Sequence, residues 1–193
     1  MDPKLVMQLR AMTGAGVLDA RNALVETKGD IEAAAEALRK RGQAKAAGRA
    51  ERSTHEGLVG CYVHATGKVG AMVEIACETD FVARSDEFKS LVHDLAMHVA
   101  ASNPLYLKLE DVPADVLAKE KEIATEEFAG SGKPVAVIEK IVEGRIAKFY
   151  ADTCLMSQSF IKDEDITITQ RVQQTIAKTG ENVQVRRFSR FAL

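Results

Sequence analysis

Histidine and cysteine, the residues that most often form metal sites or catalytic pairs, are few in this sequence, and their spacing does not suit either role. The four histidines form no H-x-x-x-H pair, and His93 and His98, five residues apart, would diverge by about 140° around a helix. Cys61 and His64 lie three apart in a segment with strand periodicity, so their side chains would face opposite sides. These spacings predict neither a metal site nor a thiolate–imidazole pair.

A glycine-rich run, Gly130-Ser131-Gly132-Lys133, is the segment closest to a phosphate-binding loop. The pattern G-x-x-x-x-G-K-[ST] needs Gly where Glu127 stands and Ser or Thr where Pro134 stands, and no predicted strand precedes the run. There is no G-x-S-x-G motif, and the abundant carboxylates read as solvated surface. We therefore expect a binding protein without an active site, cofactor or metal.

One segment has the composition of a binding site: Glu78-Thr79-Asp80-Phe81-Val82-Ala83-Arg84. It connects a predicted strand to a predicted helix, and it places a bulky Phe81 beside an acidic residue. Phe81 could fold back on its own core or against the following helix. It could instead protrude and enter a pocket of a partner. The residues by themselves leave both possibilities open.

A hairpin and a helix must position this segment. Residues 69–77 alternate with period two, which predicts a strand with one face in the core, and residues 57–64 form the preceding strand before a turn at Gly67-Lys68. The apolar stripe of residues 86–101 predicts a helix. Its expected inward residues are Phe88, Leu91, Val92, Leu95, Ala96 and Val99.

Three short amphipathic helices precede the hairpin, over residues 4–12, 17–28 and from 31 to about 42. Because such short helices are marginal alone, they predict one small three-helix domain over residues 1–42. Residues 39–52 carry six basic side chains and one acidic one, which predicts a basic linker, placed at residues 43–56.

The remaining chain predicts an α+β core over residues 57–193, built from an antiparallel sheet and helices. Helical patterns over 114–128 and 135–151 flank the glycine-rich run and predict an acidic, antiparallel helical hairpin within residues 112–151. A helix over 168–178 and a strand over 182–191 follow, and that strand is expected to join the sheet.

Composition excludes several classes of protein. The 193 residues are 46% hydrophobic and 28% charged, typical of a globular chain, and a net charge of −2 argues against a dedicated nucleic-acid binder. Three cysteines without C-x-x-C spacing, Cys61, Cys77 and Cys154, read as small core residues in a reducing compartment. No signal-peptide pattern or membrane-length apolar run is present, so we expect a cytoplasmic protein without membrane contact.

Several motifs resemble those of the bacterial translation elongation factor Ts family, the nucleotide-exchange factors of elongation factor Tu. They are L-x-x-MTGAGVLDARNAL at 9–24, GDIE at 29–32, AKAA at 44–47, ETDFVAR at 78–84, HVAAS at 98–102, GKP at 132–134, VEGR at 142–145 and VRRF-x-RF at 185–191. The resemblance implies a ubiquitin-associated-like N-terminal domain, an α+β core and a coiled-coil-like hairpin. Such a factor makes and breaks no covalent bond.

The resemblance also implies site residues. The loop that dislodges Mg²⁺ from elongation factor Tu corresponds to Thr79, Asp80, Phe81 and Val82. Contacts of the N-terminal domain with the same partner correspond to Arg10, Val17 and Leu18. The chain is similar to short members of the family, so we expect a homodimer that pairs two cores through the sheet.

Two alternatives come from other functional classes. A non-catalytic adaptor would bind peptide or ubiquitin-like partners through the three-helix domain, with Val17 and Leu18 as its patch. An RNA-associated protein would use the basic linker with Arg186, Arg187 and Arg190, although the net charge and the few aromatic residues disfavour direct nucleic-acid binding.

Overall fold

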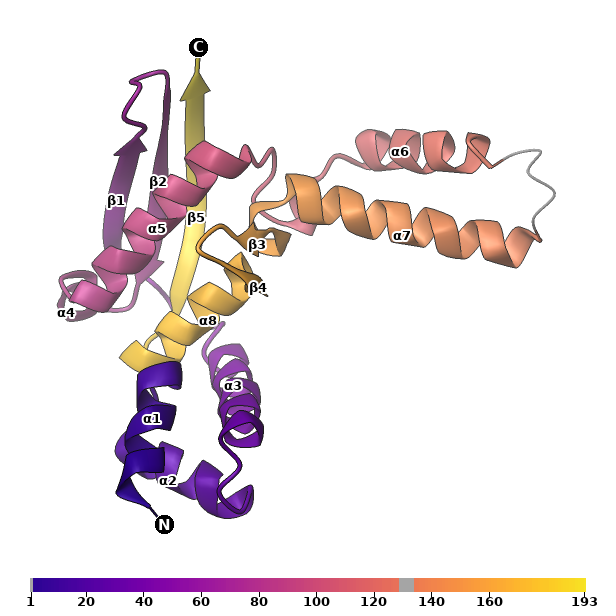
Figure 1. Ribbon diagram of the computed structural model, residues 1–193. Helices are drawn as coiled ribbons and strands as arrows, with labels where there is room; N and C mark the ends of the chain where they lie inside the picture. Colours follow the sequence, from indigo (N-terminus) through magenta and orange to yellow (C-terminus); the bar gives the residue numbers. More distant parts are fainter. Residues whose placement is uncertain (1, 129–133) are drawn as a thin grey trace. The chain divides into compact units, whose positions relative to one another are not determined.

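The computed structural model describes residues 2–128 and 134–193, and it has the predicted α+β architecture (Figure 1). The helices are α1 (Pro3–Thr13), α2 (Val17–Glu26), α3 (Ile31–Ala47), α4 (Asp80–Ala83), α5 (Asp86–Ser102), α6 (Ala114–Glu126), α7 (Val135–Thr153) and α8 (Ile168–Thr179). The strands are β1 (Glu56–Val63), β2 (Val69–Cys77), β3 (Ser159–Phe160), β4 (Asp163–Thr167) and β5 (Val183–Ala192). The glycine-rich run, Gly130 to Lys133, lies outside the described residues.

The three N-terminal helices form as predicted, around a small buried cluster. That cluster consists of Leu9, Ala20, Ala23, Leu24 and Ala34. The side chain of Asp30 accepts a hydrogen bond from the Ala33 amide at 3.0 Å and begins α3, while Gly14, in the left-handed region at φ 67°, ends α1. Polar caps and an alanine-rich core thus fix this domain.

The end of the third helix differs from the prediction. α3 continues to Ala47 instead of ending near Gly42, so the first part of the segment interpreted as a linker is helical. Gln43-Ala44-Lys45-Ala46-Ala47 contains strong helix formers, which propagate a helix that is already nucleated. The division into 1–42, 43–56 and 57–193 remains a proposal.

One sheet has the strand order β1-β2-β5, so the final strand joins the hairpin's sheet as predicted. Alternate residues of β2, from Ala71 to Cys77, are buried as the period-two pattern indicated. The predicted inward face of α5 is also buried, including Phe88, Leu91 and Val99. A Cβ built on Gly60 would lie 2.2 Å from a methyl carbon of Val92, so the α5-facing side of β1 requires glycine there.

Cys61 corrects the interpretation of the cysteines. Cys77 and Cys154 are buried, as expected, but Cys61 is exposed. Its neighbours on the same face of β1, Val59 and Val63, are exposed too, because the side of the strand that carries Gly60 faces α5.

The chain forms two compact units, each assembled from separate stretches of sequence. One contains residues 1–60, 74–94 and 170–186, and the other contains 61–73, 95–169 and 187–193. In the first, Arg171 pairs with Glu87 at 3.3 Å and with Asp94 at 3.5 Å, which ties α8 to α5. These ion pairs, in which Arg171 and Asp94 are largely buried, join the first turn of α8 to α5.

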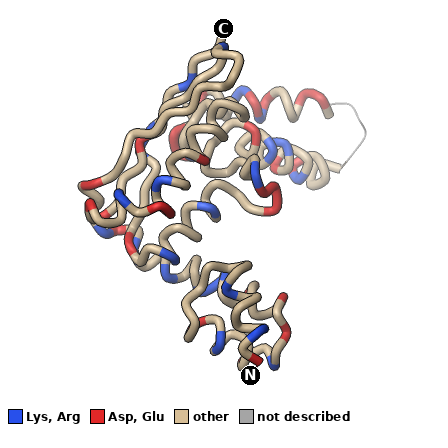
Figure 2. Tube along the Cα trace, turned by 60° about the vertical axis from the view of Figure 1, so that its left-hand side comes forward, with Lys and Arg blue, Asp and Glu red and all other residues tan. Residues whose placement is uncertain are grey.

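In the second unit, α6 and α7 lie side by side as the predicted antiparallel hairpin, and both helices carry charges of both signs (Figures 1 and 2). The buried side chain of His98 shares a hydrogen bond of 3.0 Å with Gln158, and its Nδ1 accepts the Ile161 amide. The short antiparallel pair β3–β4, which the sequence did not reveal, follows α7. In the described part of the chain, no helix is long and apolar enough to cross a membrane.

Candidate functional site

The segment between β2 and α5 is not an extended loop but the short helix α4. Thr79 begins it in an extended conformation, and its side-chain oxygen accepts a hydrogen bond from the Val82 amide at 3.4 Å. Ser85 donates its hydroxyl to the Val82 carbonyl at 2.7 Å and accepts the Phe88 amide at 3.3 Å. The segment is thereby closed at its start by Thr79 and joined to α5 by Ser85.

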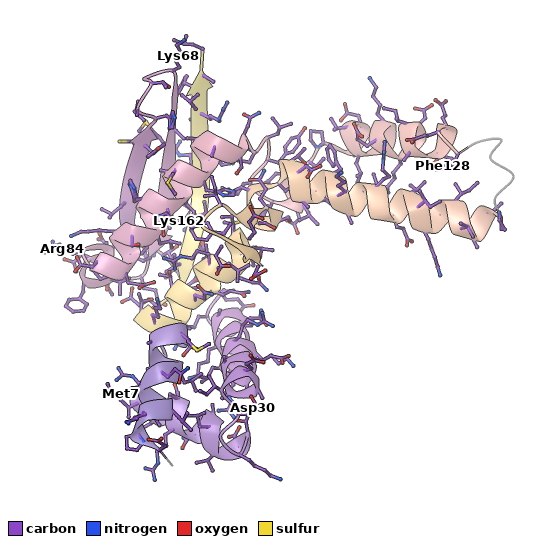
Figure 3. All side chains as sticks on the ribbon, viewed as in Figure 1. Met7, Asp30, Lys68, Arg84, Phe128 and Lys162 are labelled. Atoms are coloured by element: carbon purple, nitrogen blue, oxygen red, sulfur yellow. The ribbon has the colours of Figure 1, made fainter. Side chains whose placement is uncertain are left out.

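Phe81 and Val82 are adjacent but face opposite environments. Val82 is 5% exposed, whereas Phe81 is 81% exposed. Asp80 pairs with Arg84 at 3.0 Å across one turn, and both side chains are open to solvent; Arg84 is labelled in Figure 3. Of the two conformations left open by the sequence, the structure therefore has the protruding one, with a carboxylate beside the ring.

Two carboxylates fix the start of this segment from a distance in sequence. Glu181, in the turn between α8 and β5, accepts both the Thr79 amide at 3.0 Å and the Thr79 hydroxyl at 2.6 Å. In return, Glu78 accepts the Asn182 amide at 2.6 Å. We call Glu78, Thr79, Glu181 and Asn182 the carboxylate clasp. Because each turn supplies a carboxylate to a backbone amide of the other, the clasp joins the two turns.

The thiol beneath the clasp is held in its neutral form. Burial raises the pKa of Cys77 to about 11, and the negative charge of Glu181 acts in the same direction. The thiol donates a weak hydrogen bond to the Thr79 carbonyl at 3.2 Å. Cys77 is therefore a packing residue and not a nucleophile.

The same turn also holds the segment after α3. The buried Asn182 side chain donates to the Ala50 carbonyl at 3.2 Å and to the Arg52 carbonyl at 2.7 Å. Arg52 further lies 3.6 Å from Glu78. The end of the predicted linker is thus ordered against the turn that contains Glu181.

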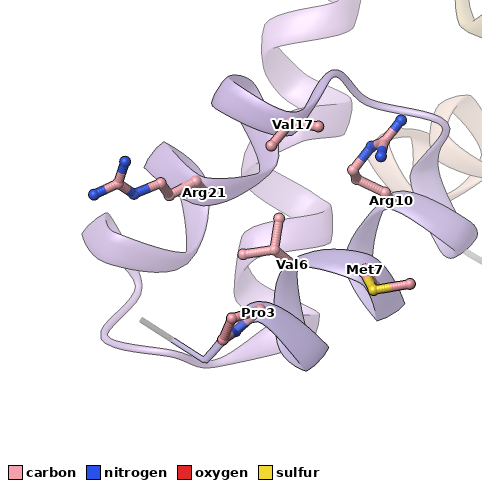
Figure 4. A pocket seen from close by; sticks show the side chains of 6 residues that line it. All are labelled: Pro3, Val6, Met7, Arg10, Val17 and Arg21. Atoms are coloured by element: carbon pink, nitrogen blue, oxygen red, sulfur yellow. The ribbon is translucent and has the colours of Figure 1, made fainter.

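The second group of predicted residues lies on the N-terminal helices. Arg10 and Val17 line a groove together with Pro3, Val6, Met7 and Arg21 (Figure 4). Leu18 is well exposed but is not among the residues that line the groove. The groove combines an apolar floor with two guanidinium groups, a composition suited to a partner surface that is apolar and acidic.

Sequence reasoning missed the carboxylate clasp. Glu181 is 102 residues from Thr79, and a Gly-Glu-Asn turn has no local pattern that predicts such a contact. Within residues 2–128 and 134–193, no three His, Cys, Asp or Glu side chains are grouped so that they could hold a metal ion.

Comparisons with known proteins place this arrangement in context. The sequence profile described as "Elongation factor TS" matches residues 20–175. The chain is 54% identical over 190 residues to elongation factor Ts of Fervidobacterium nodosum, covering 98% of this chain and 96% of that protein. It is 53% identical over 188 residues to elongation factor Ts of Geobacter sulfurreducens, covering 97% of this chain and 87% of that one.

Proposed function

The chain belongs to the elongation factor Ts family, translation elongation factors, and from that premise we propose that it is the guanine-nucleotide exchange factor of elongation factor Tu. In this proposal it binds the GDP complex of that GTPase, displaces Mg²⁺ and promotes release of GDP, so that GTP can bind. It makes and breaks no covalent bond.

The observation that carries the proposal is the exposed ring of Phe81 on a segment that is fixed at both ends. A phenyl group that is 81% exposed gains little from its own fold, so its apolar surface is available to a partner. Val82 is buried and Thr79 is held by Glu181, which limits the conformations open to Phe81 between them. Such preorganisation lowers the entropy lost on binding.

The proposed mechanism is electrostatic. In a GTPase, Mg²⁺ and the phosphate-binding loop neutralise the charge of the nucleotide phosphates. Insertion of Phe81, with Asp80 beside it, displaces the element that carries the metal. Neutralisation is lost, and the affinity for GDP falls without any contact between this chain and the nucleotide.

Thermodynamic linkage requires that the effect be reciprocal. If the factor weakens GDP binding tenfold, GDP weakens binding of the factor tenfold, which is about 1.4 kcal/mol. The strained complex therefore needs binding energy from elsewhere. We assign that role to the N-terminal groove, through Arg10 and Val17, with Leu18 as a neighbouring apolar contact.

We also propose that the factor acts as a homodimer. The exposed apolar side chains of Val59 and Val63 on β1, beside the exposed Cys61, support a sheet face that a second copy covers. Light scattering at micromolar concentration is expected to give twice the mass of 21.0 kDa. A monomeric mass would contradict this part of the proposal.

The deciding experiment follows release of fluorescent GDP from elongation factor Tu. The intact chain is expected to accelerate release, and Phe81→Ala is expected to remove most of the acceleration while the chain stays folded. Exposed Val135→Ala is the matched control and should leave release unchanged. If the intact chain binds elongation factor Tu without changing GDP release, the adaptor alternative replaces this proposal.

A further inference from the structure

We propose that Glu181 is a positioning residue that holds the Thr79–Val82 segment ready for insertion, an inference that rests on the proposed exchange function. The carboxylate takes both donors of Thr79, the amide at 3.0 Å and the hydroxyl at 2.6 Å. Two hydrogen bonds from one residue to one carboxylate fix orientation as well as distance.

The Thr79 hydroxyl takes part in two hydrogen bonds, one to Glu181 and one from the Val82 amide. Thr79 has a single hydroxyl hydrogen, which it donates in a hydrogen bond to Glu181. The lone pairs of the same oxygen are then free to accept the Val82 amide, which lies 3.4 Å away. Glu181 therefore sets the direction of the cap that begins α4.

α4 depends on the residues that flank it, because it is only four residues long. A helix of four residues has too few internal hydrogen bonds to be stable alone, so its conformation depends on contacts at its ends. The far end is joined to α5 through Ser85, whereas the near end depends on Thr79. Without Glu181, α4 stays joined to α5 through Ser85, but the Phe81 side chain loses its fixed direction.

Glu181 lies in a turn that other hydrogen bonds hold in place. Its neighbour Asn182 donates its backbone amide to Glu78 and its side-chain amide to the Ala50 and Arg52 carbonyls. The side chain of Asn182 is 2% exposed. Glu181 thus projects from a turn that is fixed independently of Thr79, as a positioning residue must.

A fluorescent reporter tests the proposal without reference to exchange. The chain contains no tryptophan, so Phe81→Trp places a single indole on α4. In this background, Glu181→Ala is expected to lower the fluorescence anisotropy of Trp while far-UV circular dichroism stays unchanged. Glu181→Gln keeps one acceptor for the Thr79 amide and is expected to give an intermediate anisotropy. Exposed Glu164→Gln serves as the control for loss of charge.

Exchange kinetics supply the second readout. With Phe81 intact, Glu181→Ala is expected to lower the maximal stimulated rate of GDP release about tenfold, with a much smaller change in the half-saturating concentration. A merely structural defect would lower the amount of active factor and leave the rate per folded molecule unchanged. Glu181→Gln should recover part of the rate.

The outcomes separate this inference from the proposed function. The positioning role is overturned if Glu181→Ala leaves the Trp anisotropy unchanged in the Phe81→Trp background. It is also overturned if Glu181→Ala leaves the maximal rate of GDP release unchanged while Phe81→Ala abolishes the stimulation. If Phe81→Ala leaves exchange intact, the proposed function of the segment fails, while the anisotropy still decides whether Glu181 orders it. If Glu181→Ala fails to fold, the comparison of Glu181→Gln with Glu164→Gln decides both readouts.

Discussion

Phe81 and Phe88 form a natural pair for separating binding from stability. They are seven residues apart on neighbouring helices, and one is 81% exposed while the other is fully buried. A phenylalanine side chain presents roughly 200 Å² of surface. About a fifth of that is covered at Phe81, which at about 25 cal/mol per Å² is worth about 1 kcal/mol.

Phe81→Ala should therefore lower the free energy of unfolding by about 1 kcal/mol or less, since alanine also favours the helical conformation. Phe88→Ala removes a buried ring and leaves a cavity, and should cost about 3–5 kcal/mol. That is a large part of the roughly 5–15 kcal/mol by which a domain is stable.

Urea unfolding followed by far-UV circular dichroism measures both variants against the parent chain. The midpoint should move little for Phe81→Ala and strongly for Phe88→Ala, with similar slopes. Comparable losses for the two variants would refute the reasoning, because they would mean that Phe81 packs against the fold in solution and is not available to a partner.

Three further predictions concern other parts of the fold. Burial lowers the pKa of His98, so the unfolded chain binds a proton at this histidine more readily than the folded chain does. The contribution of neutral His98 to the free energy of unfolding should therefore be complete above about pH 6.5 and decrease below it by at most about 1.4 kcal/mol per pH unit. In urea unfolding, the free energy of unfolding of His98→Gln should depend less on pH than that of the parent chain. Gly60→Ala should cost about 1–3 kcal/mol by denaturant unfolding, and adding Val92→Ala should restore part of it, because the new methyl group would collide with Val92. Ellman's reagent should leave Cys77 and Cys154 unlabelled in the native chain, since both thiols are buried, and rapid labelling of either would contradict that burial.

Periodicity predicted the elements that bury one face. The segments predicted at residues 86–101 and 69–77 correspond to α5 and β2. Regular spacing places the apolar side chains of each segment on one face, and that face is the one that is buried. The exposed face of β1 was harder to assign, since Leu58 and Val59 are both apolar. The position of Gly60 beneath Val92 decides it, and that contact is not local in sequence.

The candidate site was predictable in composition but not in conformation. Thr79 to Val82 stood out as an unusual mixture of residues, yet nothing local indicated a four-residue helix or the exposure of Phe81. Thr79, at the start of that helix, is held by Glu181, which lies 102 residues away in the sequence. The pair β3–β4 was missed because its strands are short and largely polar.

The hydrogen bonds from Asn182 to the Ala50 and Arg52 carbonyls shorten the free part of the linker after α3. α3 ends at Ala47, and the first carbonyl held by Asn182 is only three residues later. Three residues span at most about 11 Å, so an N-terminal domain docked on a partner keeps α4 within a small volume. In such a tethered arrangement the second contact forms at a high effective concentration. Under the proposed function, Phe81 can then reach its target repeatedly without binding it tightly, as a factor that dissociates after each exchange requires.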